Sequence, residues 1–169
     1  MTDDDLHITP RVARVLMSEE AIYGLILVSG MIVVAGSDDG RSLSVLVTVA
    51  VTVLVFYAAH VYAGALGRLA ATDGSGGLGT SLRAAARQSS GMLAASVPAI
   101  IVLALGTTHV IADATANWTA LVLNTIVLGA LGWIAVARWT THWAPRIISA
   151  LITAAFGGAL IALKALIHH

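Results

Sequence analysis

The sequence predicts an all-α polytopic membrane protein, a bundle of about five transmembrane helices with little mass outside the bilayer. Of its 169 residues, 58% are hydrophobic and only 11% are charged, whereas a soluble domain carries about 25% charged residues. Five stretches of this chain are long and apolar enough to cross a bilayer, which takes ~20 helical residues for a hydrocarbon core of about 30 Å. The length leaves room for one domain, and we expect residues 15–169 to form it.

The predicted spans follow one another with short, turn-rich joins. Their bounds in chain order are 15–36, 43–67, 91–112, 118–137 and 145–167. The first span is the shortest apolar run, because its unbroken part covers only 21–36 and has to draw in the residues before it to cross. The one long join, 68–90, is expected to be a glycine-rich flexible linker with a short basic helix at 81–88 on the membrane surface.

The basic residues predict that the N-terminus lies in the cytoplasm and the C-terminus outside. One side of the membrane would hold Arg11, Arg14, Arg68, Arg83, Arg87, Arg138 and Arg146. The other would hold only Arg41 and Lys164, and cytoplasmic loops are the ones that carry the excess of Lys and Arg. We therefore expect residues 1–14 to be a polar cytoplasmic segment and 68–90 a cytoplasmic linker. Lys164, at the outer end of the last span, is expected to extend its amine to the membrane surface.

Several classes of function are disfavoured by the composition. The chain has no cysteine, which excludes disulfides and cysteine-ligated metals. Its formal net charge is zero, so no bulk field attracts nucleic acid. The residues before the first span lack the features of a cleaved signal peptide, so that span is expected to be retained. We expect no cofactor and no metal, with the lipid bilayer as partner and the bacterial inner membrane as location. His168 and His169 resemble the remnant of a purification tag.

Ionisable residues within the predicted spans are candidates for function, because they are costly in lipid. They are Glu19, Glu20, His60 and His109. At ~1.5 Å per residue, Glu20 lies about 9 Å beyond Arg14 along its helix. His60 lies about 12 Å before Arg68 by the same rise. Since both arginines mark the inner surface, we predict that Glu20 and His60 meet across the first two spans.

A carboxylate beside an imidazole is suited to relaying or sensing protons, since histidine changes its charge near neutral pH and an acid stabilises the charged form. We therefore interpret Glu20, Tyr23, Tyr57 and His60 as a candidate proton or small-ion site. The alternative is structural. Ser18 would cap the first helix, with Glu19 and Glu20 in its favourable first turn, while His60 bonds a neighbouring helix.

Two further groups of residues have a predicted role. Thr108, His109 and Asn124 form a second polar cluster by their depth near the outer surface, most simply joined by an interhelical hydrogen bond. In the last span, small side chains recur every four residues and form a ridge that permits close helix packing, within a protomer or between protomers of a homo-oligomer. The ridge consists of Ala150, Ala154, Gly158 and Ala162.

The segments Ser-Glu-Glu-Ala-Ile-Tyr-Gly at 18–24 and Phe-Tyr-Ala-Ala-His-Val-Tyr-Ala at 56–63 resemble those of small uncharacterised bacterial integral membrane proteins. These proteins share an EAIYG start and an AHVYA segment in the second span. The resemblance covers about the first 70 residues of the chain. It implies a multi-pass membrane protein and no particular activity.

A second resemblance is to the CAAX-processing and bacteriocin-immunity family of intramembrane proteases, which carry E-E-x-x-x-R, F-x-x-x-H and H-x-x-x-N motifs in that order. It implies that Glu19 or Glu20 activates water. His60 and His109 would bind a metal or stabilise an oxyanion, and Asp113 would stand in for the asparagine. Gly24 occupies the position of the family's arginine.

The sequence thus leaves three interpretations. The first is a protein without enzymatic activity that passes or senses protons or small ions near Glu20 and His60. The second is a membrane scaffold without transport. The third is an intramembrane hydrolase of the kind that the second resemblance implies.

Overall fold

The computed structural model describes residues 18–38 and 40–167, so the predicted polar segment 1–14 and the pair His168-His169 lie outside the described residues. The described chain forms five helices: α2 (Glu19–Asp38), α3 (Ser42–Ala71), α4 (Leu78–Thr107), α5 (Asp113–Ala137) and α6 (Trp143–Ile167). Each is long and apolar enough to cross a membrane. The predicted all-α fold, with five helices in the described chain that are long and apolar enough to cross a membrane, is therefore confirmed.

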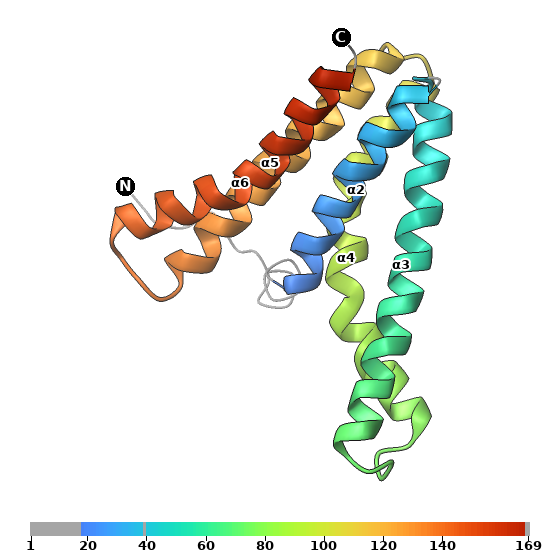
Figure 1. The fold of residues 1–169 in the computed structure, drawn as a ribbon, viewed down its shortest axis with the longest axis vertical. Helices are drawn as coiled ribbons and strands as arrows, with labels where there is room; N and C mark the ends of the chain where they lie inside the picture. The colour runs from blue at the N-terminus through green and yellow to red at the C-terminus, as the bar shows by residue number, and fades with distance from the viewer. Residues whose placement is uncertain (1–17, 39, 168–169) are drawn as a thin grey trace, which may run out of the picture.

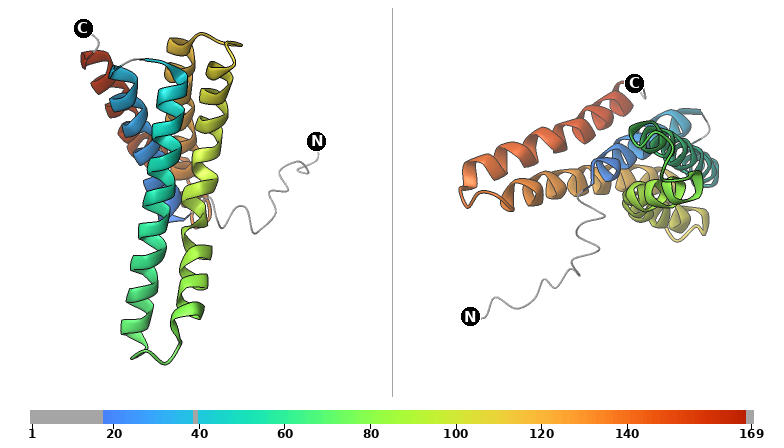
Figure 2. Two further views of the ribbon diagram at one scale, coloured as in Figure 1. Left: turned by 90° about the vertical axis from the view of Figure 1, so that its right-hand side faces the viewer. Right: turned by 90° about the horizontal axis from the view of Figure 1, so that it is seen from below.

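Two antiparallel hairpins, α3–α4 and α5–α6, meet at one end of the molecule and diverge toward the other, with α2 between them (Figure 1). Seen from below, the α5–α6 hairpin extends to one side of α3–α4 (Figure 2). We call the end where the hairpins meet the shared end, and the opposite end the open end. Helix α2 contacts each of the four other described helices, so it holds the two hairpins together.

The packed interior follows α2 along its length. Leu25, Val28 and Ile32 are fully buried on one face of this helix. Around them lie side chains from the neighbouring helices, including Val49 of α3 and Leu103 of α4. Because lipid is as apolar as these side chains, the interior is stabilised mainly by close van der Waals packing rather than by the removal of apolar surface from water.

The segment 68–90 is helical over most of its length, so the helix predicted at 81–88 is confirmed as part of α4, whereas the prediction of a long linker is wrong. Helix α3 continues to Ala71, a turn spans 72–77, and α4 begins at Leu78. Alanine, arginine and glutamine are frequent in 82–88 and favour a helix, so the glycines affect only the turn. At ~1.5 Å per residue, helices of 30 residues are about 45 Å long, so this hairpin extends beyond a hydrocarbon core of about 30 Å.

Helices α5 and α6 pack closely where glycines allow their backbones to approach. A Cβ on Gly132 of α5 would meet the hydroxyl of Thr153 and lie 2.7 Å from the carbonyl oxygen of Ser149. A Cβ on Gly157 of α6 would lie 2.9 Å from the Cα of Thr125. The contact face of α6 thus contains Ser149, Thr153 and Gly157, which are spaced four residues apart.

The predicted small-residue ridge of α6 lies at the edge of the α5–α6 contact rather than at its centre. Ala150 and Ala154 lie against Gly129, whose added Cβ would be 3.4 Å from the Cβ of Ala154. Ala162 is exposed, and no described atom lies within 4 Å of a Cβ built on Gly158. Whether the outer part of the ridge contacts a second protomer stays a prediction.

We expect Gly157→Ala to destabilise the protein and the neighbouring Gly158→Ala to leave it nearly unchanged. The added methyl at position 157 would press on the backbone of α5, at a cost of about 1–3 kcal/mol, whereas the one at 158 has room. Thermal unfolding of the two variants in the same detergent measures the difference. Equal midpoints would contradict the α5–α6 contact described above.

Candidate functional site

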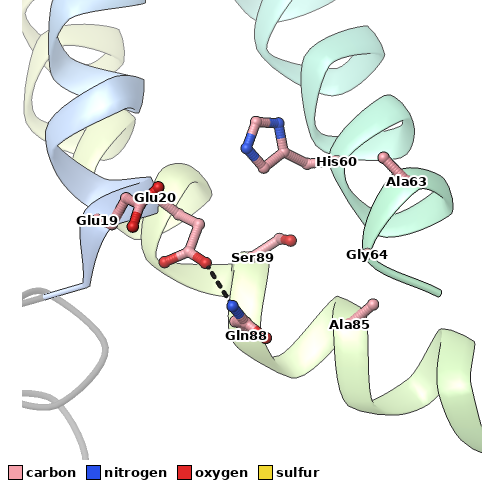
Figure 3. A pocket seen from close by; sticks show the side chains of 8 residues that line it. All are labelled: Glu19, Glu20, His60, Ala63, Gly64, Ala85, Gln88 and Ser89. Atoms are coloured by element: carbon pink, nitrogen blue, oxygen red, sulfur yellow. Dashed lines mark hydrogen bonds between the residues drawn. The ribbon is translucent and has the colours of Figure 1, made fainter. Parts of the chain in front are cut away.

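A polar pocket of about 280 Å³ lies between α2, α3 and α4, at the N-terminal end of α2. Figure 3 shows the side chains around it. The lining residues are Glu19, Glu20, His60, Ala63, Gly64, Ala85, Gln88 and Ser89. Three of them have no side chain larger than a methyl group, which leaves room between the helices. The pocket therefore combines ionisable groups with small apolar walls.

Glu20 lies in the first turn of α2, and only 8% of its surface is exposed. Its Oε1 accepts a hydrogen bond of 2.9 Å from Nε2 of Gln88. The Oε1 of Gln88 accepts a bond of 2.7 Å from the guanidinium of Arg68. The orientation of the amide follows from its neighbours, since arginine can only donate and a carboxylate only accepts. Gln88 thus links a cation on α3 to a carboxylate on α2.

His60 lies on α3, and its ring points into the same pocket as Glu20 (Figure 3). The imidazole stacks on the ring of Phe56, one turn earlier, with 6.3 Å between centroids. The structure thus brings Glu20 and His60 to one pocket, as their depths predict. The hydrogen bond that Glu20 accepts, however, comes from Gln88.

The two tyrosines of the predicted site do not line the pocket. Tyr23 of α2 is 51% exposed. The hydroxyl of Tyr57 donates to the carbonyl oxygen of Ala86 at 3.3 Å, which ties α3 to α4 beside the pocket. Tyr57 precedes His60 by three residues and lies near its face of α3, but its long side chain reaches the backbone of the neighbouring helix instead.

Gln88 and Ser89 are not among the predicted site residues, because 81–88 is expected to be a short helix on the membrane surface within a linker that extends to residue 90. Ser89 of α4 is only 4% exposed and lines the pocket. Among the described residues, its hydroxyl has no hydrogen-bond partner. The signal that could have found both residues is the run of helix-forming residues before the third predicted span, which continues that helix toward its N-terminus.

One helical turn beyond the pocket, α2 and α4 close against each other. A Cβ on Gly24 would lie 3.0 Å from the Cα of Met92. Met92 and Leu25 are fully buried, and Leu25 belongs to an apolar cluster with Ala95 and Leu128. On the side that faces the interior of the bundle, the pocket therefore ends against packed apolar side chains.

The second predicted cluster is not assembled. Thr108 and His109 are exposed where α4 ends, and His109 has a φ of 58° in the loop before α5. Asn124 is instead fully buried and donates to the hydroxyl of Ser29 at 3.0 Å. A buried interhelical hydrogen bond does occur at this position of α5, as expected, but it joins α5 to α2.

Lys164 of α6 does not extend to the surface, contrary to the prediction. It is only 2% exposed, and its Nζ would lie 3.0 Å from a Cβ on Gly36 near the end of α2. The amine also lies 5.5 Å from the centroid of the Trp118 ring. A cation is favoured at a helix C-terminus and over an indole face, and these interactions fix α6 to α2 and α5 at the shared end.

The residues implied by the protease resemblance do not converge. Glu19, Glu20 and His60 line the pocket, whereas His109 lies 20 residues beyond Ser89 along α4, or about 30 Å at the helical rise. Asp113 begins α5 and accepts a hydrogen bond of 3.1 Å from the backbone of Ser42. Within residues 18–38 and 40–167, no three histidine or acidic side chains are placed to hold a metal ion.

Comparison of the chain with protein-family models, with curated proteins and with solved structures gave no match.

We expect Gln88→Met to lower the thermal stability of the protein in detergent. The variant keeps the helix and most of the side-chain volume but removes the donor to Glu20, a loss of about 1–3 kcal/mol for a buried acceptor. Arg87→Met changes the neighbouring residue, which is exposed like Gln88 but does not line the pocket, and is the control. If both variants unfold at the temperature of the parent, the bridge to Glu20 contributes nothing to stability.

Proposed function

We propose that this multi-pass membrane protein binds a proton or a small cation at the pocket formed by Glu20 and His60, and that this binding is its sensing step. The observation that carries the proposal is the pocket itself, in which a largely buried carboxylate and an imidazole from two helices face one space. A proton on either group changes the charge of a site with few competing charges.

Sensing is favoured over passage by what surrounds the pocket. Leu25 and Met92 are fully buried one turn further in, and the close approach of Gly24 to Met92 leaves little room beside them. Transfer of an ion from the pocket to the shared end would require this packing to open.

The position of α2 offers a way for such a signal to spread. Glu20 lies in the first turn of α2, a helix that contacts the four other described helices. A change in its bond to Gln88 would alter the link to Arg68 on α3. We infer that protonation shifts α2 relative to the α3–α4 hairpin.

We further propose that the open end faces the cytoplasm of a bacterium, at its inner membrane. Arg68, Arg83 and Arg87 all belong to the α3–α4 hairpin near its turn at the open end, and basic residues of short loops favour the cytoplasmic side. The resemblance to small bacterial membrane proteins agrees with this location.

A scaffold is the second candidate function, and the observation that favours it is the exposure of α6. Among its exposed large side chains are Ile148, Leu151 and Phe156, and beside them Gly158 leaves open space. This surface can hold lipid or a helix of a second protomer.

A pH titration tests the first proposal. A single cysteine placed by Ala63→Cys in this cysteine-free chain puts an environment-sensitive dye at the pocket wall. We expect the dye signal to change between about pH 5 and 8, the range in which histidine titrates. His60→Ala should remove this transition, and His109→Ala should leave it in place. A transition that is absent, or that both variants leave equally unchanged, would contradict the proposal and favour the scaffold.

A further inference from the structure

We propose that the cation taken by this pocket is an organic primary ammonium ion with a short apolar body. The inference rests on the proposed function, because it assigns a ligand class to the same site. It is carried by the size of the pocket, by the hydrogen-bonding groups that face it, and by the chemistry of its walls.

The pocket is much larger than a bare ion requires. Its volume of about 280 Å³ compares with about 30 Å³ for each water molecule in the liquid, and so corresponds to on the order of nine non-hydrogen atoms. A monatomic ion in this space would contact side chains on one side only. A small organic molecule would contact α2, α3 and α4 together.

The groups around the pocket call for a cationic donor. Glu19 and Glu20 supply two carboxylates, and Glu20 uses one of its oxygens for Gln88. Ser89 is only 4% exposed, and its hydroxyl, which has no partner among the described residues, points into the same space. An ammonium group has three donors and no acceptor, which suits the second oxygen of Glu20, the Ser89 oxygen and a ring nitrogen of His60.

Arg68 does not neutralise the site directly. Its guanidinium donates to Gln88, and it is the neutral amide that reaches Glu20. The carboxylate therefore has no cationic group bonded directly to it among the described residues, and charge-assisted hydrogen bonds to it are stronger than neutral ones.

The remaining walls accept an apolar body. Ala63 and Gly64 come from α3 and Ala85 from α4, and none of them offers a side-chain hydrogen bond. A short hydrocarbon attached to the ammonium would lie against these walls, while a strongly polar body would lose its hydration there without compensation.

Binding of phenethylamine and of 2-phenylethanol to the detergent-solubilised protein tests the inference, because the two probes differ mainly in the ammonium group. We expect phenethylamine to raise the thermal midpoint in a saturable way and the alcohol to have little effect. Glu20→Gln, which can still accept from Gln88, should weaken amine binding at least about tenfold, the effect of one charge-assisted hydrogen bond. Ser89→Ala should weaken it a few-fold.

A pocket-filling pair controls for indirect effects. Ala63→Leu occupies the wall of the pocket and should abolish amine binding, whereas Ala59→Leu, one turn earlier on the same helix and outside the pocket, should not. Equal effects of the two probes, or amine binding that survives Glu20→Gln and Ala63→Leu, would overturn the ammonium assignment. A pH transition that still depends on His60 would then leave the proposed function standing, while loss of that dependence would refute the proposed function whatever the amine does.

Discussion

Helix α2 carries polar side chains into a bundle that lipid surrounds, and each of these groups needs a partner within the protein. An unsatisfied polar group in a hydrocarbon environment costs several kcal/mol. The structure meets this constraint at two levels of α2, where Glu20 accepts from Gln88 of α4 and Ser29 accepts from Asn124 of α5. At a third level, Gly36 leaves space for the amine of Lys164 from α6. The depth and rotation of α2 are thereby fixed against three different helices, and the geometry of the pocket depends on this arrangement.

The polar groups outside the pocket differ from one of those that line it in whether they have a partner within the protein. The Ser29–Asn124 bond is buried, and the contacts of Asp113 and Lys164 lie at the shared end. These interactions connect helices, whereas the groups around the pocket include the hydroxyl of Ser89, which has no partner in the described chain. Among the described residues, Glu20 and Gln88 both connect helices and line the pocket.

Much of this could be predicted from the sequence, and the failures have physical causes. Five long apolar runs predict five helices, because only a closed hydrogen-bonded backbone is stable in lipid. Glu20 and His60 were placed at one depth by counting residues from flanking arginines, which works since the helical rise is constant. Counting residues along a helix gives the depth of a side chain but does not determine its hydrogen-bond partner. The sequence predicts a surface helix at 81–88 and so does not pair Gln88 with Glu20, and it pairs Asn124 with His109 although Asn124 lies on the face toward α2.

Ser89 borders the pocket, and if small cations enter this pocket, a single cysteine at this position reacts with a small cationic reagent. Ser96 is seven residues further along α4, on the same face, and is buried with its hydroxyl bonded to the carbonyl oxygen of Leu93. In vesicles or detergent, we expect Ser89→Cys to react with 2-aminoethyl methanethiosulfonate, and faster than with the anionic sulfonatoethyl reagent, while Ser96→Cys stays unreactive. An unreactive cysteine at 89, or equal rates at 89 and 96, would show that no such pocket exists.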